Sequence, residues 1–430
     1  MAVDKAQYDL TLEMAKHLDP HLILPLLDHL QENEMYPVKD ILKAKLAIVE
    51  QTDMAGHHNE IWQELNETEN DVPGHSERTQ KALETFDLYE RENQPLFEMI
   101  KDPNVASQLK SDKQFNIQLL TEEHGFKVEM LDKFYEGALF QYAIGQYASA
   151  SDMLYHLLIL STDAEKIASA MWGKLASDIL NQDWPTALEQ INSLKEFIDQ
   201  REYGSPVEQL QQRTWLVTWA LFVFFNHDNG REKLLELFLQ PTYLNVIQTA
   251  VPWMLRYITI SAVIQKKQRG VLKELIRLIR NEVHVYRDPV VDFVEALFVD
   301  YDFETAQTKL AQCGDLIASD FFVQDLYELF LENARLLMFE NYCRIHQVLD
   351  ITELSERLNM APDAGEKWIV NLIRDARMDA KIDAATNTVV IRTQCPTIHA
   401  QIMDKTHWGE AAMGPCFRPQ SSAAPVTQAR

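Results

Sequence analysis

Cysteine is rare in this sequence, which has four cysteines in 430 residues. They are too far apart for a Cys-x-x-Cys metal pair and too few to cross-link a chain of this length. We therefore expect free thiols in a reducing compartment at all four positions, Cys313, Cys343, Cys395 and Cys416. Glycine is also scarce, with 13 residues, and 46% of the chain is hydrophobic. This composition is typical of a globular protein and argues against a fibrous or disordered one.

Positive charge is in deficit, because the formal net charge at pH 7 is -25. Affinity for nucleic acid depends largely on Lys and Arg side chains that displace counterions from phosphates, so a broad attraction to RNA or DNA is excluded. Residues 1–133 hold about twice as many acidic as basic side chains. Such a surface either keeps a large protein in solution or steers it toward a basic partner.

Long hydrophobic runs are missing as well. The longest strongly apolar stretch, WLVTWALFVFF at residues 215–225, is about half as long as the roughly 20 residues that cross a membrane. We expect it to form a buried helix. The N-terminal stretch MAVDKAQYDLTLEMAK is polar and carries no apolar signal core. These two features predict a cytoplasmic protein without membrane contact.

Signatures of catalysis are absent from the sequence. It contains no Gly-rich phosphate loop, no Gly-x-Ser-x-Gly elbow and no Cys-His nucleophile context. His17 and His21 are four residues apart, as zinc ligands on a helix can be, but their neighbours do not complete a His-Glu-x-x-His signature. We therefore expect a protein that is not an enzyme, with no catalytic residues, metal, cofactor or small-molecule substrate.

Helical periodicity is the strongest pattern that is present. In HLILPLLDHLQENEMY, residues 21–36, leucines recur on one side of a helix, and similar patterns continue to about residue 340. These leucines are Leu22, Leu24, Leu26, Leu27 and Leu30. The pattern predicts an all-α architecture for most of the chain.

A short pattern recurs three times in this helical part, with an aromatic residue three positions before an alanine. The pairs are Tyr147 with Ala150, Trp184 with Ala187, and Phe303 with Ala306. The pattern resembles the turn of a tetratricopeptide-like hairpin, in which the aromatic residue closes the turn and the alanine lets the helices approach. Because such hairpins cannot bury their apolar face alone, they stack. We therefore expect a right-handed helical-repeat solenoid of the TPR/HEAT-like type.

The segment 350–391 has a different pattern. Asp350 and Glu353 are spaced as a capping pair before a short helix that ends at Asn359, and Pro362 suits the first turn of a second helix. Two alternating stretches, 379–383 and 388–392, follow and flank a polar turn. Two helices and a hairpin in this order predict a winged helix with a small β-wing.

The charge of this module bears on what it contacts. A winged helix that reads DNA normally presents net positive charge to the groove. Residues 341–392 carry 7 basic and 8 acidic side chains, so the module is nearly neutral. We therefore favour protein contact, and a nucleic-acid-binding regulator is the less favoured alternative.

A stripe of basic residues stands out on this acidic chain, in QKKQRGVLKELIRLIR at residues 265–280. Steps of three, four, four and three residues place Lys266, Arg269, Lys273, Arg277 and Arg280 on one face of a helix. The stripe is either a solvated helix face or a contact for ribosomal RNA, mRNA or an acidic neighbouring protein.

A helical solenoid that ends in a winged helix resembles the PCI domain family of proteasome lid, COP9 signalosome and translation initiation factor subunits. Three segments carry a more specific resemblance to the initiation factor 3 members: WGKLASDILNQDW, ENARLLMFENYCRIHQ and KWIVNLIRDARMDAKID. The resemblance implies a non-catalytic scaffold subunit that supports mRNA recruitment and translation initiation. Its implied partners are other PCI-containing initiation factor 3 subunits, the small (40S) ribosomal subunit and, indirectly or weakly, mRNA. A proteasome lid or signalosome subunit is the alternative within the same fold.

The resemblance also implies where partners bind, on the wing at 379–391 and on the helix at 362–375. Within these segments we expect partner contacts from Lys367, Asn371, Arg374, Lys381, Val389 and Ile391. The expected domains are a helical-repeat region at 1–215 and a PCI domain at 216–392, with a helical part at 216–340 and the winged helix at 341–392. Residues 393–430 form a tail, with a short helix followed by a stretch without helical periodicity.

Overall fold

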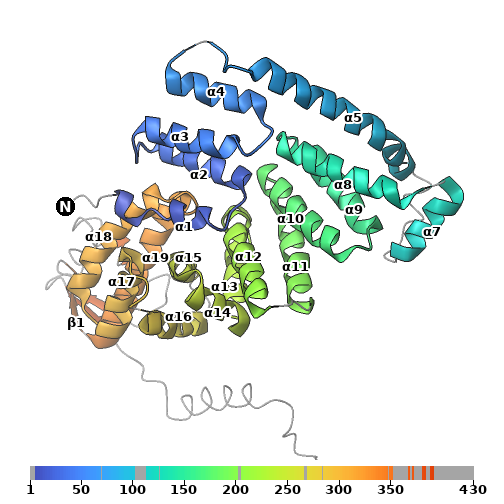
Figure 1. Ribbon diagram of the computed structural model, residues 1–430. Coiled ribbons are helices and arrows are strands. Elements are labelled where there is room, and N and C mark those ends of the chain that lie inside the picture. Colours follow the sequence, from blue (N-terminus) through green and yellow to red (C-terminus); the bar gives the residue numbers. More distant parts are fainter. Residues whose placement is uncertain are drawn as a thin grey trace, which may run out of the picture. The chain divides into compact units, whose positions relative to one another are not determined.

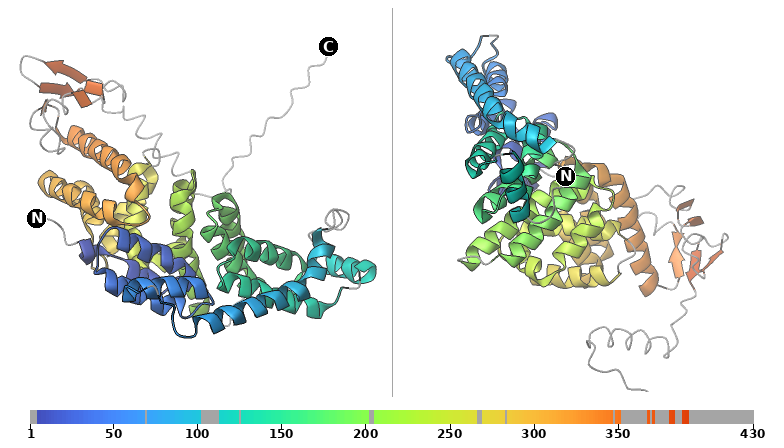
Figure 2. Two further views of the ribbon diagram at one scale, coloured as in Figure 1. Left: turned by 90° about the horizontal axis from the view of Figure 1, so that it is seen from above. Right: turned by 90° about the vertical axis from the view of Figure 1, so that its right-hand side faces the viewer.

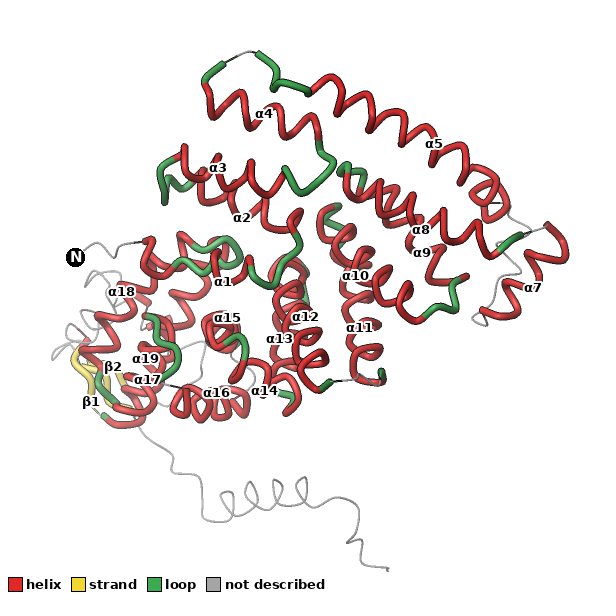
Figure 3. Tube along the Cα trace, viewed as in Figure 1, coloured by secondary structure: helices red, strands yellow, loops and turns green. Residues whose placement is uncertain are grey.

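The computed structural model describes residues 5–68, 70–101, 113–124, 126–201, 205–265, 269–282, 284–346, 348–351, 367–368, 370–371, 380–383 and 388–391. Within these ranges the chain is mostly helical, with a small sheet toward the C-terminus, as expected (Figures 1 and 3).

The first helices are η1 (Lys5–Tyr8), α1 (Thr11–Ala15), α2 (Pro20–Glu32), α3 (Val38–Val49), α4 (Ala55–Asn66), α5 (His75–Lys101), α7 (Lys113–His124), α8 (Val128–Ala143), α9 (Tyr147–Leu160), α10 (Ala164–Leu180) and α11 (Trp184–Gln200). They are followed by α12 (Pro206–Asn226), α13 (Gly230–Phe238), α14 (Pro241–Thr249), η2 (Pro252–Met254), α15 (Leu255–Ile264), α16 (Arg269–Glu282) and α17 (Pro289–Glu295). The last elements are η3 (Ala296–Asp300), α18 (Phe303–Ser319), η4 (Gln324–Leu326), α19 (Tyr327–Ile345), β1 (Val348–Asp350), β2 (Ala380–Asp383) and β3 (Thr388–Ile391).

The chain divides into two compact units after Met338. Unit 1, residues 1–338, contains the helices up to the first part of α19, and unit 2, residues 339–430, contains the end of α19 and the sheet. Helix α12 runs without a break through residues 215 and 216, where the sequence predicts a domain boundary.

Successive helices of unit 1 pack on one another. Helix α2 packs on α3 and α3 on α4, and a second run of contacts leads from α5 through α8, α9, α10 and α11 to α12. Figures 1 and 2 show α9, α10 and α11 side by side. Farther along, α15 contacts α13, α16 and α17, and α17 packs on α18. Most sequence neighbours are thus also neighbours in space.

The apolar run at 215–225 lies in α12, as predicted, and its residues 216–224 are all buried. No single helix in the described ranges is both long enough and apolar enough to cross a membrane. The segments Pro241–Thr249 and Pro252–Ile264 reach that length and hydropathy only when taken together, and the chain bends by 115° between them.

The aromatic and alanine pairs lie where the repeat pattern predicts them. Helices α9, α11 and α18 begin at the three aromatic residues, and the three alanines are fully buried; the residues are Tyr147, Trp184, Phe303, Ala150, Ala187 and Ala306. The small side chains thus allow close helix packing at equivalent positions of three hairpins.

The turns before α9 and α11 share one backbone geometry. Gly145 has φ 92° and Gln182 has φ 60°. In each turn the following N–H bonds to the carbonyl oxygen five residues earlier, from Gln146 to Gln141 at 2.9 Å and from Asp183 to Asp178 at 3.0 Å. These bonds define Schellman motifs, which satisfy the last carbonyl groups of α8 and α10. The recurrence in the sequence therefore reflects a recurring local structure.

Unit 2 contains a three-stranded antiparallel sheet with the order β1-β3-β2. The hairpin of β2 and β3 confirms the two strands expected from alternation, with Ala380 opposite Ile391 and Asp383 opposite Thr388. Strand β1 was not predicted, and it pairs with β3 so that Leu349 lies opposite Val389. Both of these side chains are buried, at 1% and 0% exposure. Strand β3 is therefore central, and β1 and β2 are the edges.

Much of the expected winged helix lies outside the described residues, including the capping partner Glu353, the helix end at Asn359 and the helix start at Pro362. The tail at 393–430 lies outside them as well. Trp368 is half-buried, and its ring packs perpendicular to that of Phe339, with 6.1 Å between the ring centroids.

Candidate functional site

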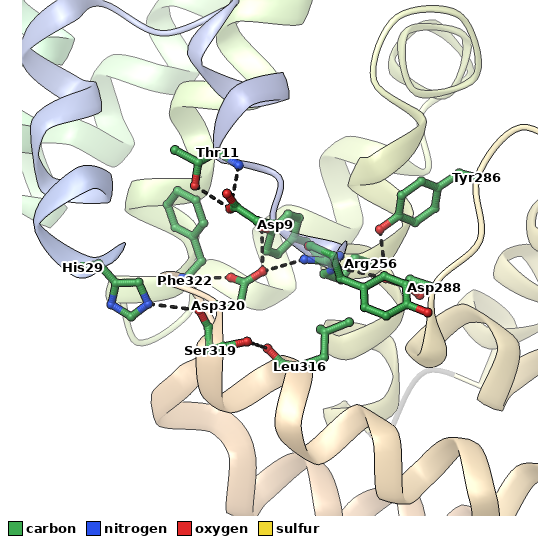
Figure 4. A network of polar contacts seen from close by, with 12 residues as sticks. Asp9, Thr11, His29, Arg256, Tyr286, Asp288, Leu316, Ser319, Asp320 and Phe322 are labelled. Atoms are coloured by element: carbon green, nitrogen blue, oxygen red, sulfur yellow. Dashed lines mark hydrogen bonds and ion pairs between the residues drawn. The ribbon is translucent and has the colours of Figure 1, made fainter. Parts of the chain in front are cut away.

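Arg256 on α15 is the centre of a buried ionic network in unit 1 (Figure 4). Its Nε donates to Asp288 Oδ2 at 2.9 Å, and its Nη1 donates to Asp320 Oδ2 at 3.0 Å. Its Nη2 donates to the carbonyl oxygen of Tyr8 at 2.8 Å. The arginine side chain is only 2% exposed. One guanidinium thus connects η1 with the residues that precede α17 and follow α18.

Both carboxylates accept further hydrogen bonds. The donors, at 2.7 to 3.1 Å, are Val291 N and Tyr286 Oη for Asp288, and Tyr257 Oη and Phe322 N for Asp320. The bond from Val291 caps α17, because Asp288 stands directly before the first turn of that helix. Each carboxylate is thus bonded to the guanidinium, to a phenol and to a backbone N–H.

The charge states of this network follow from its burial. Burial alone would lower the pKa of Arg256, but Tyr286 and the two carboxylates raise it, so that the pKa lies well above its ordinary value. The pKa values of Tyr257 and Tyr286 are raised, mainly by burial. The second cause is the negative charge of the carboxylate to which each phenol donates, Asp320 for Tyr257 and Asp288 for Tyr286. The arginine therefore stays charged and the phenols stay protonated as donors.

The network stabilises the fold and has no room for a substrate. Its surplus negative charge is offset by the phenols and by the N-terminus of α17, where the helix dipole favours an anion. Buried charges persist when they are paired and hydrogen-bonded in this way. The cavity beside Arg256, Asp320 and Asp9 has a volume of about 30 Å³, which holds water only.

A second polar cluster joins the start of α2 to the hairpin of α8 and α9. Asp19 caps α2 by accepting from His21 N at 3.0 Å, and it also accepts from Tyr142 Oη at 2.6 Å. His21 Nδ1 lies 2.9 Å from Tyr147 Oη, and its ring packs on that of Tyr142 with 4.5 Å between the centroids. Burial lowers the pKa of His21 and, with Asp19, raises the pKa of Tyr147 to about 12. The repeat aromatic Tyr147 is thus also a contact for the N-terminal helices.

Two more contacts attach α2 and the segment before it to distant helices. Trp219 Nε1 on α12 donates to the carbonyl oxygen of His17 at 2.9 Å. His29 Nε2 lies 3.2 Å from the carbonyl oxygen of Ser319, and the His29 ring packs perpendicular to that of Phe321. Helix α2 therefore sits at the junction of the two runs of helices.

The two histidines considered as zinc ligands have structural roles. His21 is in the tyrosine cluster, and His17 supplies the carbonyl oxygen that holds Trp219. In the described part of the chain, no group of three or more His, Cys, Asp or Glu side chains is arranged to hold a metal ion.

The expected free thiols are present where the structure describes them. Cys313 and Cys343 are both free and buried. Burial raises the pKa of Cys343 to about 12 and that of Cys313 well above its ordinary value, so neither is a reactive thiolate. Cys395 and Cys416 lie outside the described residues.

The basic stripe falls largely on α16. Lys273, Arg277 and Arg280 are exposed, whereas Leu275 and Ile279 on the same helix are buried. The helix therefore has the predicted apolar and basic faces. Lys266 and the side chain of Arg269 lie outside what the structure describes.

The structure describes some of the predicted partner contacts of the winged helix and not others. Lys367 and Asn371 are exposed, as expected, and Arg374 lies outside the described residues. Lys381 lies in the edge strand β2 and Ile391 in the central strand β3.

The expectation that the side chain of Val389 contacts a partner was wrong, because this side chain is fully buried. Since successive residues of a strand point to opposite faces, the neighbouring Val390 is the outward one, with 40% exposure. It lies opposite Val348 of β1, which is 60% exposed. These two valines form an exposed apolar pair that the sequence analysis missed.

Arg256 was also missed, although the sequence contains a signal for it. It is the single charged residue in the apolar run WMLRYITISAVI, residues 253–264. A lone charge in a run of this kind has to be paired when the helix is buried. The partners are 32, 64 and 248 residues away, so the pattern indicates a buried charge without indicating what neutralises it.

We predict that Arg256→Ala destabilises the protein strongly, by about 3–5 kcal/mol, because it leaves two buried carboxylates without their cation. Denaturant unfolding of the full-length chain measures the change. Arg287→Ala is the matched control, because Arg287 is 58% exposed and pairs with Asp292 and Glu295 at the surface. Its loss should cost less than about 1 kcal/mol. Equal effects of the two substitutions would contradict a structural role for the network.

We also predict that stability falls with decreasing pH through protonation of His21. Its pKa in the folded chain is below the ordinary 6.5, so the unfolded state binds the proton more readily. The stability is therefore complete above about pH 6.5 and is lost as the pH falls below it. His21→Asn, which keeps a hydrogen-bonding group near Tyr147, should reduce the loss of stability between about pH 7 and pH 5. Urea unfolding at both pH values measures this, and an unchanged loss would show that His21 is not responsible.

Two family descriptions match parts of the chain. The eIF3 subunit 6 N terminal domain matches residues 9–141, which cover α1 to α8. The PCI domain matches residues 310–393, which cover the end of α18, α19 and the sheet. The expected PCI domain is thereby confirmed in a mostly helical chain, and the matched part begins at residue 310.

Relatives match over nearly the whole chain. The E subunit of eukaryotic translation initiation factor 3 from Arabidopsis thaliana is 41% identical, over 94% of this chain and 95% of the relative. The protein of the same name from Aspergillus clavatus is 42% identical, over 93% of this chain and 90% of the relative. The one from Aspergillus niger is 40% identical, over 98% of this chain and 94% of the relative. This identity extends through both units of the structure, and the chain belongs to the family of E subunits of eukaryotic translation initiation factor 3.

Proposed function

We propose that the chain works as a scaffold whose winged helix joins it to neighbouring PCI-containing subunits. Membership of the family makes it a non-catalytic subunit of the initiation factor 3 complex, which acts in translation initiation, and implies other subunits of that complex as partners. The observation that carries the scaffold proposal is the exposed valine pair on the sheet, with Val348 in the edge strand β1 and Val390 opposite it in β3. Edge strands offer unpaired backbone groups for pairing with another chain.

We also propose how the helices are organised into a repeat region and a PCI domain. We infer that the helical hairpins form a right-handed repeat solenoid over residues 1–215 and that the PCI domain occupies 216–392, with the winged helix at 341–392. The shared Schellman turns and the buried alanines support repeated hairpins. Work in the cytoplasm, on the small ribosomal subunit and with weak or indirect mRNA contact, is the setting that this function requires.

If the wing contacts neighbouring subunits, charged side chains on its apolar pair should weaken their binding. Replacing Val348 and Val390 by Asp should reduce the amount of neighbouring subunits that co-purify with the tagged chain about tenfold, because a charge is then placed in an apolar contact. Two Asp side chains directly opposite each other on β1 and β3 repel, so the free energy of unfolding is measured as well. The single variants Val348→Asp and Val390→Asp lack this repulsion, and each should still reduce co-purification while costing no more than about 1 kcal/mol. Leu12→Asp, at a position that is 77% exposed in α1, is the control and should leave co-purification unchanged. Intact assembly of the double variant would contradict the wing as the contact.

The exposed basic face of α16 supports a further contact, which we propose is with the phosphate backbone of ribosomal RNA. Three exposed cations on one face of a helix can each displace a counterion from RNA, although the chain as a whole is acidic. A solvated face remains the alternative, and an acidic protein neighbour is the other possible partner.

Reversing the charge of the basic face of α16 distinguishes an RNA contact from a solvated face and from a contact with an acidic protein. We predict that changing Lys273, Arg277 and Arg280 to Glu weakens binding of the assembled complex to purified small ribosomal subunits and lowers the salt dependence by roughly 2 units of slope. The control changes the same amount of charge elsewhere, at the exposed residues Lys16, Lys39 and Lys43. Equal effects of both triple variants would contradict a specific contact. Loss of a co-purified subunit with unchanged ribosome binding would identify a protein partner instead.

The scaffold function as a whole is tested by affinity purification of the tagged full-length chain from its own cells after nuclease treatment, followed by mass spectrometry and crosslink mapping. We expect initiation factor 3 subunits to dominate and crosslinks to fall on 341–392. Recovery of proteasome lid or signalosome subunits in their place would overturn the function while leaving the PCI fold intact.

A further inference from the structure

The first half of α5 exposes an apolar face. Among residues 75–92, all of which the structure describes, no side chain is buried, whereas Leu96 and Ile100 farther along the helix are. Thr79, Ala82, Leu83 and Phe86 follow helical spacing, so they share one face. Leu83 is 61% exposed. The described chain contacts this half of α5 at Arg78, which bonds to Thr52, and at Tyr89, whose ring packs near that of Phe140. An amphipathic helix normally buries its apolar face, but here the face that carries Leu83 is only partly covered.

This face forms one wall of a groove with a volume of about 390 Å³. The N-terminus of α4 also lines it, with Ala55, Gly56 and His57. The linker residues Asp53 and Met54 line it together with Ile144 and Gln146 from the turn between α8 and α9, and the face of α5 contributes Thr79, Ala82, Leu83 and Phe86. The size is within the range of binding pockets, about 300–1,000 Å³.

The base of the groove is fixed by backbone hydrogen bonds. Asp53 N donates to the carbonyl oxygen of Ala143 at 3.2 Å, which attaches the linker to the end of α8. The guanidinium of Arg78 on α5 donates to the carbonyl oxygen of Thr52. The groove is therefore preformed, and Met54 supplies a flexible side chain that adapts to an apolar group.

The surroundings of the groove are strongly acidic. Residues 53–98, which include the parts of α4 and α5 that line the groove, contain 12 acidic and 3 basic side chains. Asp53, Glu84 and Asp87 are exposed near the apolar face. Phosphate groups of RNA or of an anionic membrane would be repelled by this charge, whereas Lys and Arg side chains would be attracted. The complementary occupant is therefore a protein segment with an apolar side and basic flanks.

We propose that this groove, the α4–α5 groove, binds an amphipathic basic helix of a partner subunit. The four side chains on α5 leave gaps between them, and apolar side chains at i, i+3 and i+4 of a second helix can pack into these gaps. The partner's Lys and Arg residues then lie beside the exposed acids. The proposal rests on the scaffold function, because it supplies a second attachment point that is separate from the winged helix in sequence and belongs to the other unit.

The test places a photo-crosslinking amino acid at position 83 of the tagged full-length chain in its own cells. Position 88 on the same helix is the matched control, because Leu88 is 54% exposed and does not line the groove. After irradiation and purification of the complex, mass spectrometry maps the crosslinked peptide. The proposal expects crosslinks from position 83 but not from 88, to a partner segment with net positive charge and apolar residues at helical spacing.

A synthetic peptide of the crosslinked segment then binds the purified full-length chain. Leu83→Glu should weaken this binding at least about tenfold, and Leu88→Glu should not change it. Since both side chains are exposed, neither change should affect folding, which circular dichroism checks. Some crosslinks to this chain itself are expected, because its own residues line the groove. Equal crosslinking from both positions, crosslinks from position 83 only to this chain, to RNA or to an acidic segment, or unchanged binding by Leu83→Glu would each overturn the proposal.

The same experiment separates this inference from the scaffold function. If initiation factor 3 subunits co-purify and position 83 gives no specific crosslink, the α4–α5 groove is not a docking site and the scaffold function stands. If none of these subunits co-purifies, the scaffold function fails and takes the groove proposal with it.

Discussion

The paired charge of Arg256 is the constraint on which the arrangement of unit 1 depends. Its guanidinium is buried and bonded to Asp288, Asp320 and the backbone of Tyr8, and the farthest of these partners, Tyr8, is 248 residues away in the sequence. A buried cation tolerates few arrangements, since every lost partner leaves a charge unsatisfied in a medium of low polarity. The hydrophobic effect has no preferred direction, whereas the hydrogen bonds of this network do, so they favour one arrangement of η1, α15, α17 and α18.

Helix α2 extends this constraint to the rest of the unit. Asp19 and His21 at its start hold the hairpin of α8 and α9 through Tyr142 and Tyr147. His29 toward its end contacts the last residue of α18, Ser319, and the ring of Phe321 that follows. The two proposed surfaces of unit 1 are built on this frame. The α4–α5 groove is attached through the end of α8, and the basic face of α16 is carried by a helix that packs on α15. A scaffold that binds several neighbours needs such fixed spacing, because binding surfaces that move independently lose affinity to ordering entropy.

The sequence predicted what depends on local patterns. Periods of 3.6 and 2 residues identified the helices and the β2–β3 hairpin, and the aromatic and alanine pairs identified the starts of α9, α11 and α18. Strand β1 was missed because only three residues pair and the last of them, Asp350, also begins a helix-capping pattern. Val389 was placed on the wrong face because the strand period is two, so an error of one residue exchanges interior and surface. The Arg256 network was out of reach, since its partners are distant in the sequence.

The measurement that tests this account most directly is hydrogen-deuterium exchange of the full-length chain and of Arg256→Met. If the network holds the N-terminal helices, the amides of α1 and α2 and of residues 319–322 should exchange faster in the variant, while those of α10 and α11 stay protected. Faster exchange confined to α15, or a uniform increase over the whole of unit 1, would contradict the claim that this one charge fixes the junction.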